Sequence, residues 1–141
     1  MKLLYSILCS DILTDRETGS TTYIRTIDQI STPGIPILIP SLSIGTCWKF
    51  EKGDEKEYDV KIEIANPSEE RKPQFPIFKL KAEKDKLFHR INIRLSPFQI
   101  EKTGNYIISF AWKLRTSTDW IKEESLILSV ILKKMEKEVI H

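Results

Sequence analysis

The sequence contains few of the residues from which catalytic and metal sites are usually built. Only two of its 141 residues are histidine and two are cysteine, and one histidine, His141, is the last residue. A serine or cysteine nucleophile needs a basic partner such as histidine, and a structural zinc site takes about four cysteine or histidine ligands. The other histidine, His89, falls on an apolar stripe, where a hydrogen-bonded core side chain is the commoner role. We therefore predict no enzyme activity, no catalytic or metal-binding residues and no cofactor.

Glycine and long apolar runs are scarce as well. The five glycines are scattered, so the sequence has no glycine-rich loop that could hold a phosphate group. No segment reaches the ~20 apolar residues that cross a membrane. Residues 1–9 have the outline of a lipoprotein signal, but Leu8 stands directly before Cys9, where such a signal needs a small residue. These observations favour a buried first β-strand in a cytoplasmic protein that has no membrane partner.

An excess of charge of one sign is also absent. The 22 basic and 20 acidic residues nearly cancel, and lysine and glutamate alternate within the same segments, as in residues 51–57. Nucleic-acid binders usually carry a clear basic excess, because much of their affinity comes from contacts with phosphates. We therefore expect a solvated surface of mixed charge and no nucleic-acid partner. Cys9 and Cys47 are expected to be reduced and buried in the cytoplasm, although a Cys9–Cys47 disulfide remains open for an exported protein.

What the sequence does have is a repeated alternation of apolar and polar side chains, which is typical of β-strands. In residues 58–64 every second side chain is apolar, while Asp59, Lys61 and Glu63 would face water. A helix over the same residues would bring these charges onto its apolar face, so the helical interpretation fails. The same alternation gives four further predicted core stripes: Leu42, Ile44, Trp48 and Phe50; Leu87, Ile91, Ile93 and Leu95; Tyr106, Ile108, Phe110, Trp112 and Leu114; and Leu126, Leu128, Val130 and Leu132.

Turn-forming segments separate these strands at short intervals. Residues 15–19, for example, can close a hairpin between residues 2–12 and 20–30. About eight strands with short connections predict an all-β protein, a two-layer antiparallel β-sandwich, rather than βαβ units. The length fits one domain over residues 1–141, and the charged tail from residue 133 to residue 141 is expected to fray or to form a short helical turn.

One segment departs from the alternating pattern. Residues 32–40 contain three prolines among four large aliphatic side chains. Proline cannot donate a hydrogen bond within a central strand, so we expect an edge strand or an extended crossing between sheets. The aliphatic side chains either cap one open end of the core or form an exposed patch for association. The candidate partner-binding residues here are Ile35, Ile37, Leu38 and Ile39.

Two other features could bind a ligand or a partner. Trp48 and Trp112 fall on inward faces and are expected to be structural, whereas Trp120 follows a polar turn. Trp120 is therefore either an exposed anchor for a ligand or partner, or a packed residue at the start of a strand. Acidic side chains also gather around the first hairpin, where oxygen-rich loops could hold calcium, although their spacing matches no calcium loop. These acidic residues are Asp11, Asp15, Glu17 and Asp28.

Two features resemble immunoglobulin-like domains. The segment Gly104-Asn105-Tyr106, followed by alternating apolar residues, looks like a tyrosine corner, in which a tyrosine hydroxyl bonds to backbone a few residues upstream. Trp48, on an early strand, is similar to the buried tryptophan of such domains. The cysteine pair of antibody domains is missing, so the resemblance implies an immunoglobulin-like sandwich and not an antibody-type domain. Tyr106 is accordingly expected to be structural.

The N-terminal third carries a second resemblance. The matching residues are Cys9-Ser10-Asp11, Gly19, Asp28-Gln29-Ile30, Pro36 and Pro40-Ser41-Leu42. With these residues the chain resembles a family of short, uncharacterised bacterial and phage-associated β-sandwich proteins, a domain of unknown function. Two positions depart from that pattern, because Ser10 intervenes between the cysteine and the acid and Arg25 stands where a glycine is expected. The resemblance implies a β-sandwich and no established activity.

No motif in the sequence specifies an activity. The leading hypothesis is therefore a non-enzymatic protein-interaction or accessory module that binds a protein partner or forms a homo-oligomer. It would act through sheet edges, the proline-containing crossing or the loops at the ends of the strands. The alternative is a carbohydrate or small-ligand binder that uses Trp120 and the acidic hairpin, with calcium assisting. A third hypothesis, an enzyme of unrecognised type, would require His89 exposed beside a carboxylate in a cleft.

Overall fold

The computed structural model describes residues 1–133, and these contain twelve strands and no helix. No helix in this part of the chain is therefore long and apolar enough to span a membrane. The all-β prediction is confirmed, but the sequence pattern predicted about eight strands. Five of the strands have only two to four residues, too few for alternation to identify. The strands are β1 (Lys2–Thr14), β2 (Thr21–Thr26), β3 (Gln29–Thr32), β4 (Ile37–Ile39), β5 (Leu42–Lys49), β6 (Glu57–Ala65), β7 (Phe78–Lys81), β8 (Phe88–Leu95), β9 (Phe98–Ile100), β10 (Gly104–Leu114), β11 (Ile121–Lys122) and β12 (Leu126–Leu132).

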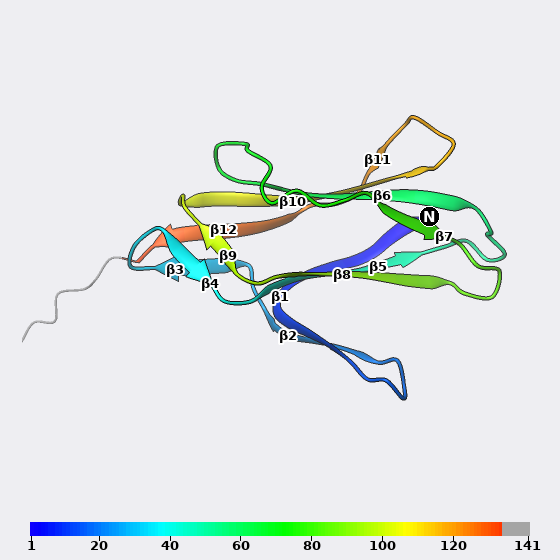
Figure 1. Ribbon diagram of the computed structural model, residues 1–141, viewed down its shortest axis with the longest axis horizontal. Helices are drawn as coiled ribbons and strands as arrows, with labels where there is room; N and C mark the ends of the chain where they lie inside the picture. The colour runs from blue at the N-terminus through cyan, green and yellow to red at the C-terminus, as the bar shows by residue number, and fades with distance from the viewer. Residues whose placement is uncertain (134–141) are drawn as a thin grey trace, which may run out of the picture.

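The strands form three sheets. Sheet A has the order β2-β1-β5-β8, sheet B has the order β3-β12-β10-β6-β7 with β11 beside β10, and β4 pairs with β9 in a small third sheet. In Figure 1 sheet B runs above sheet A, and the β4–β9 pair lies at the left-hand end. Every pairing is antiparallel except that of β3 with β12, which is parallel. After β2 the chain crosses from sheet A to sheet B. There it forms β3, which runs in the same direction as β12.

One buried cluster contains side chains from both large sheets. Val60, Ile62 and Ile64 of β6 are at most 2% exposed, and Leu42 and Ile44 of β5 are at most 1% exposed. The predicted core stripes are confirmed in their central parts. Their ends differ, since Leu126, Trp112 and Leu114 are half-buried and Leu132 and Leu87 are exposed. Leu132 is exposed because the pairing of β10 with β12 ends at Gly104 and Val130, so that the last residues of β12 extend past β10.

Trp48 is the largest fully buried side chain. Its indole Nε1 donates a hydrogen bond to Thr46 Oγ1 at 2.9 Å, and the Thr46 hydroxyl in turn donates to the Ile91 carbonyl at 2.8 Å. The first bond lies within β5, and the second joins the middle of β5 to β8 inside the core. The predicted structural role of Trp48 is thus supported by both its packing and its hydrogen bond.

β1 takes part in two pairings along its length. Residues Lys2–Cys9 pair with β5, and residues Cys9–Thr14 pair with β2 in the hairpin predicted from the turn at residues 15–19. This hairpin projects from sheet A in Figure 1. Near its base a Cβ atom at Gly45 would lie 2.5 Å from a ring carbon of Tyr23, so glycine allows this close approach. The hydroxyls of Tyr5 and Tyr23 are hydrogen-bonded at 2.9 Å.

The two cysteines are free and buried. The register of sheet A places Cys9 opposite Ser43 and Cys47 opposite Tyr5. The two thiols are thus offset by four residues along β5, about 13 Å, whereas a disulfide needs Cα atoms within about 7 Å. The disulfide that the sequence left open is therefore excluded by the register. Apart from Lys133, the predicted charged tail lies outside the described residues.

Candidate functional site

The proline-containing crossing, residues 32–40, forms the edge of the small third sheet. The Thr32 hydroxyl donates to the Gly34 carbonyl at 2.7 Å and fixes the turn that leads out of β3. β4 then pairs with β9, with Leu38 opposite Gln99. At the far end the Ser96 hydroxyl donates to the Pro40 carbonyl at 2.8 Å. The crossing is therefore held at three points along its length.

The alternation within β4 divides its aliphatic side chains between two roles. Ile37 and Ile39 are packed against the core, on the same face as the buried Phe98 and Ile100 of β9. Leu38 points away from the core and is 58% exposed, and Ile35 is 38% exposed. The two interpretations drawn from the sequence, a cap over the core and an exposed patch, therefore each describe part of the segment.

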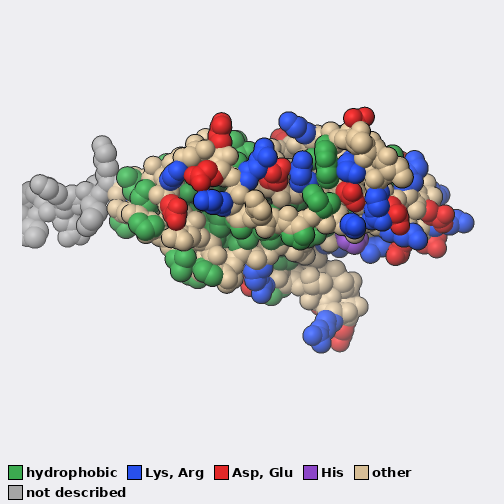
Figure 2. Space-filling model, turned by 45° about the horizontal axis from the view of Figure 1, so that its top comes forward, with side chains coloured by type: hydrophobic (Ala, Val, Ile, Leu, Met, Phe, Trp, Pro, Cys, Tyr) green, Lys and Arg blue, Asp and Glu red, His purple; other side chains and the backbone are tan. Residues whose placement is uncertain are grey.

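Other exposed apolar side chains lie at the same end of the molecule. Leu132 is 54% exposed, and its backbone is opposite Thr32, where the crossing begins. Figure 2 shows hydrophobic side chains gathered at the left-hand end, where Figure 1 places β3, β4 and the end of β12. We call Ile35, Leu38 and Leu132 the apolar end.

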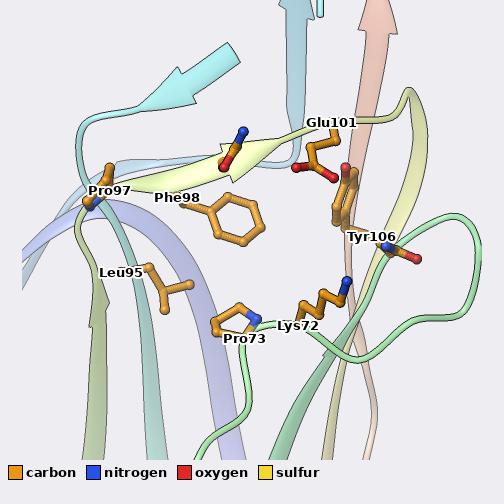
Figure 3. Close-up of a pocket in the computed structure, with 9 residues that line it drawn as sticks. Lys72, Pro73, Leu95, Pro97, Phe98, Glu101 and Tyr106 are labelled. Atoms are coloured by element: carbon orange, nitrogen blue, oxygen red, sulfur yellow. The ribbon is translucent and has the colours of Figure 1, made fainter. Parts of the chain in front are cut away.

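A small cavity of ≈ 270 Å³ opens beside β9. Figure 3 shows the rings of Phe98 and Tyr106 on its walls, with the side chains of Lys72 and Glu101 also bordering it. The two rings are 6.1 Å apart at 76° to each other. Pockets for drug-sized ligands run from about 300 to 1,000 Å³, so this cavity fits a small group at most. Its nine lining residues are Asn66, Lys72, Pro73, Leu95, Pro97, Phe98, Gln99, Glu101 and Tyr106.

A cluster of paired charges around Glu70 lies beside this cavity. Glu70 accepts hydrogen bonds from Lys102 Nζ at 3.2 Å and from Asn66 Nδ2 at 3.3 Å, and Lys72 Nζ lies 3.1 Å from its other oxygen. The bond from Lys72, followed by those from Asn66 and Lys102, lowers the pKa of Glu70 to about 2. The carboxylate is therefore ionised throughout the physiological range. It holds the loop after β6 against the start of β10.

The cavity carries no nucleophile with a base. Its lining residues include no histidine, cysteine, serine or threonine. His89 lies instead on β8, opposite Trp48, and is half-buried. Burial, together with the positive charge of Lys86, lowers the pKa of His89, and within residues 1–133 no carboxylate is hydrogen-bonded to it. The exposed His89 beside a carboxylate that the third hypothesis required is therefore not seen among the described residues.

Tyr106 makes the bond expected of a tyrosine corner. Its hydroxyl donates to the Lys102 carbonyl at 3.0 Å, and the ring is 3% exposed. Its structural role is therefore supported by the geometry. This bond fixes the turn between β9 and β10 and with it one wall of the cavity.

Replacing Tyr106 by phenylalanine keeps the ring and removes this bond together with the longer one, 3.4 Å, that the hydroxyl accepts from the Lys102 N–H. We expect Tyr106→Phe to lower the free energy of unfolding by about 1–2 kcal/mol, because the Lys102 carbonyl loses a partner. Chemical denaturation followed by tryptophan fluorescence would measure the change. An unchanged unfolding midpoint would mean that solvent replaces the bond without cost.

Trp120 lies at a different place from the apolar end. It is half-buried, with Lys61 Nζ 4.5 Å and Lys113 Nζ 5.4 Å from the centre of its ring. It borders a separate pocket of ≈ 290 Å³ on the outer face of sheet B, together with Glu63 and Arg71. Trp120 is therefore neither a fully exposed anchor nor a fully packed residue, because lysine side chains cover part of its ring.

Two of the four acidic residues around the first hairpin, Asp11 and Asp15, have partners within the fold, whereas Glu17 and Asp28 are exposed. Asp11 forms an ion pair with Arg94 and also accepts the backbone N–H of Ile12 at 2.8 Å. Asp15 accepts the N–H of Glu17 at 2.8 Å and so caps the hairpin turn. Among residues 1–133 no three histidine, cysteine, aspartate or glutamate side chains are placed to hold a metal ion. The hairpin therefore gives no support to the calcium-assisted alternative.

Sequence reasoning missed two polar groups that connect distant elements. Asp59 of β6 lies 3.2 Å from Lys113 Nζ and 3.4 Å from Arg115 Nε, and its side chain is only 13% exposed. Glu123 Oε1 accepts the indole N–H of Trp112 at 3.0 Å and the N–H of Leu3 at 3.3 Å, which links sheet B to β1. Trp112, expected on an inward face, is half-buried with its ring against Tyr58. No local sequence pattern predicts such pairs, because their members are not neighbours in the sequence.

These elements define an all-β protein built from several sheets, with an apolar end and a small cavity beside it. The sequence profile of a family of unknown function, DUF6941, matches residues 4–113. The chain belongs to this family. The match extends well beyond the N-terminal third on which the resemblance to an uncharacterised family rests. No curated protein matches the chain.

Proposed function

We propose that this protein is a non-enzymatic interaction module that binds a protein partner through the apolar end. The observation that carries the proposal is the exposure of Leu38, 58%, on a strand that is fixed in place. Binding costs less when the contact residues are already ordered, and a few side chains at the centre of an interface contribute most of the affinity. Ile35, earlier in the same crossing, and Leu132, opposite Thr32 where the crossing begins, add to the exposed apolar surface.

The open edge of β4 adds a second means of recognition. Among the described residues β4 pairs only with β9, so one of its edges remains without a partner strand. An extended segment of another protein can add to such an edge and place its side chains beside Leu38. We propose this mode of binding for the apolar end. The module is proposed to act in the cytoplasm and to be bacterial or phage-associated, which the N-terminal motif supports.

We also propose that the domain is a two-layer sandwich of immunoglobulin-like topology. In such domains strands A, B and E share one sheet and strands C, F and G share the other. The orders β1-β5-β8 and β12-β10-β6 are consistent with this arrangement. The bond of Tyr106 at the start of β10 also supports it, since a tyrosine corner occupies strand F. Trp48 lies on β5, the counterpart of strand B, whereas the tryptophan of antibody domains lies on strand C.

A carbohydrate or small-ligand site is the second candidate function. The half-buried ring of Trp120 beside a pocket of ≈ 290 Å³ favours it. The basic and acidic side chains around that pocket, including Arg71 and Glu63, could bind the polar groups of a ligand. A glycan array together with titrations followed by tryptophan fluorescence would test this function, and silence in both would remove it.

Replacing Leu38 by glutamate tests the leading proposal. We expect Leu38→Glu to weaken binding of the partner by about 10-fold or more, because a charge would be buried in an apolar contact. The tagged wild type and the variant would each capture proteins from lysate of the source cells for identification by mass spectrometry. The identified partner would then be titrated against both.

The matched control is Leu13→Glu, since Leu13 is 52% exposed and lies on the hairpin of β1 and β2. It should bind the partner as the wild type does. A partner that binds Leu38→Glu as tightly as the wild type, or a wild type that captures no protein, would contradict the proposal.

A further inference from the structure

The strand β8 forms an open edge of sheet A, the lower layer in Figure 1. In the order β2-β1-β5-β8 it is the last strand, and its eight residues pair with β5. Within residues 1–133 it pairs with no other strand. Alternate residues of an edge strand point their N–H and C=O groups away from the partner strand, so about half of these groups face outward. This row of donors and acceptors is longer than that of β4, which has three residues.

The side chains of β8 alternate between the core and solvent. Ile91 and Ile93 point into the core and are 6% and 8% exposed. Arg90, Asn92 and Arg94 point to the outer face of sheet A and are exposed. Residues rise by about 3.3 Å along a strand, so the two arginines lie about 13 Å apart with Asn92 between them. The open edge is therefore flanked by positive charge at a regular spacing.

Sheet A is the basic part of an otherwise balanced chain. Its four strands contain a single carboxylate, that of Asp11, whereas the whole chain has 22 basic and 20 acidic residues. Asp11 pairs with Arg94, but both side chains are exposed, and exposed ion pairs are weak enough for a second carboxylate to share the arginine. The basic side chains of the sheet are Lys2, Arg25, Lys49, Arg90 and Arg94.

We propose that β8 binds an extended acidic segment of another protein, which adds to sheet A as a fifth strand. The backbone of the segment would pair with the outward N–H and C=O groups of β8, and its acidic side chains at alternate positions would face Arg90 and Arg94. Lys49, on the adjacent strand, adds to the positive potential. This edge differs from the apolar end in sheet and in chemistry, so the inference does not rest on the function proposed above.

Two other occupants fit this edge less well. If two copies of the chain paired their β8 strands antiparallel about Asn92, Arg90 of one copy would be opposite Arg94 of the other. Like charges directly opposite each other destabilise a sheet. A nucleic acid would use the positive charge, but its binding comes from phosphate contacts and leaves the outward C=O groups of β8 unpaired. An acidic extended peptide matches both the charge and the open backbone groups.

The probe for this inference is a fluorescein-labelled octapeptide of alternating glutamate and threonine, because threonine favours strands and glutamate supplies the charge. Titration of the full-length protein at low salt, followed by fluorescence polarisation, should give saturable binding with a dissociation constant below about 1 mM. Arg90→Glu/Arg94→Glu should weaken binding at least about 10-fold. Arg16→Glu/Lys122→Glu makes the same change in net charge at exposed positions outside sheet A and should bind as the wild type does.

A second measurement leaves the protein unchanged. The same octapeptide, methylated on every backbone nitrogen, keeps its charge but cannot donate hydrogen bonds to β8. It should bind at least about 10-fold more weakly than the unmethylated peptide, because it cannot form the ladder of a fifth strand. With the unmethylated peptide bound, amide hydrogen exchange should slow within β8.

Failure of the octapeptide to bind at about 1 mM would overturn the inference. Equal binding by Arg90→Glu/Arg94→Glu, or equal binding of the methylated peptide, would overturn it as well. A single-stranded DNA of the same charge that binds more tightly than the octapeptide would make this surface a nucleic-acid site instead. Leu38→Glu should bind the octapeptide as the wild type does, and a loss of binding in that variant would place the peptide at β4.

Discussion

Trp48→Ala is expected to lower the free energy of unfolding by about 3–5 kcal/mol, the usual cost of removing a large aromatic side chain from a core. The side chain is 0% exposed, so its removal leaves a cavity beside the end of β5 that the surrounding strands can fill only in part. The Thr46 hydroxyl also loses the indole N–H that it accepts, although it keeps the Ile91 carbonyl as its acceptor. Native domains are stable by only about 5–15 kcal/mol, so this loss is a large fraction of the total.

Urea denaturation followed by circular dichroism would measure this change. Trp120→Ala is the matched control, because the same residue type is replaced where it is only half-buried. Its effect should be within about 1 kcal/mol of the wild type. If Trp48→Ala and Trp120→Ala were equally destabilising, the core assigned to β5 would be wrong.

Asp59→Ala is expected to cost about 3 kcal/mol, because it leaves two cationic side chains without their shared carboxylate in a largely buried place. The Lys113 side chain is 15% exposed, and its ammonium group also donates to the Ser117 carbonyl at 2.9 Å. Asp59 therefore helps to fix the loop after β10, which carries Trp120. In addition to the loss of stability, we expect faster amide hydrogen exchange in residues 115–120.

Glu57→Ala is the control for this second variant. Glu57 pairs with the same Arg115, at 2.7 Å, but its side chain is 48% exposed. Exposed ion pairs contribute about 0–1 kcal/mol, so the variant should unfold close to the wild-type midpoint. Equal effects of Asp59→Ala and Glu57→Ala on stability would show that burial of the Asp59 group does not matter.

The sequence predicted the features that depend on neighbouring residues. The alternation at residues 58–64 identified β6, and the turn at residues 15–19 identified the first hairpin. The segment around Tyr106 predicted a hydrogen bond to upstream backbone, which the structure contains. In each case a few consecutive residues carry the whole signal, because side-chain direction along a strand and turn conformation are local properties.

Other features depend on residues that only the fold brings together. Asp59 and Arg115 are 56 positions apart in the sequence, and no spacing rule connects them. The pairing of β4 with β9 decides that Leu38 is exposed while Ile37 is packed against the core, and the sequence alone left both roles open. Gly45 did carry a signal, since an isolated glycine inside a strand marks a close approach, but the sequence does not identify Tyr23 as the neighbour.

The register of sheet A has a consequence for where the protein can work. Because Cys9 and Cys47 lie opposite different partners on adjacent strands, oxidation cannot tie them together without moving a whole strand. Both thiols are buried, and burial is the main cause of the raised pKa of Cys9, which lowers its thiolate fraction and hence its reactivity. The fold therefore disfavours a bond between Cys9 and Cys47 in reducing and oxidising surroundings alike.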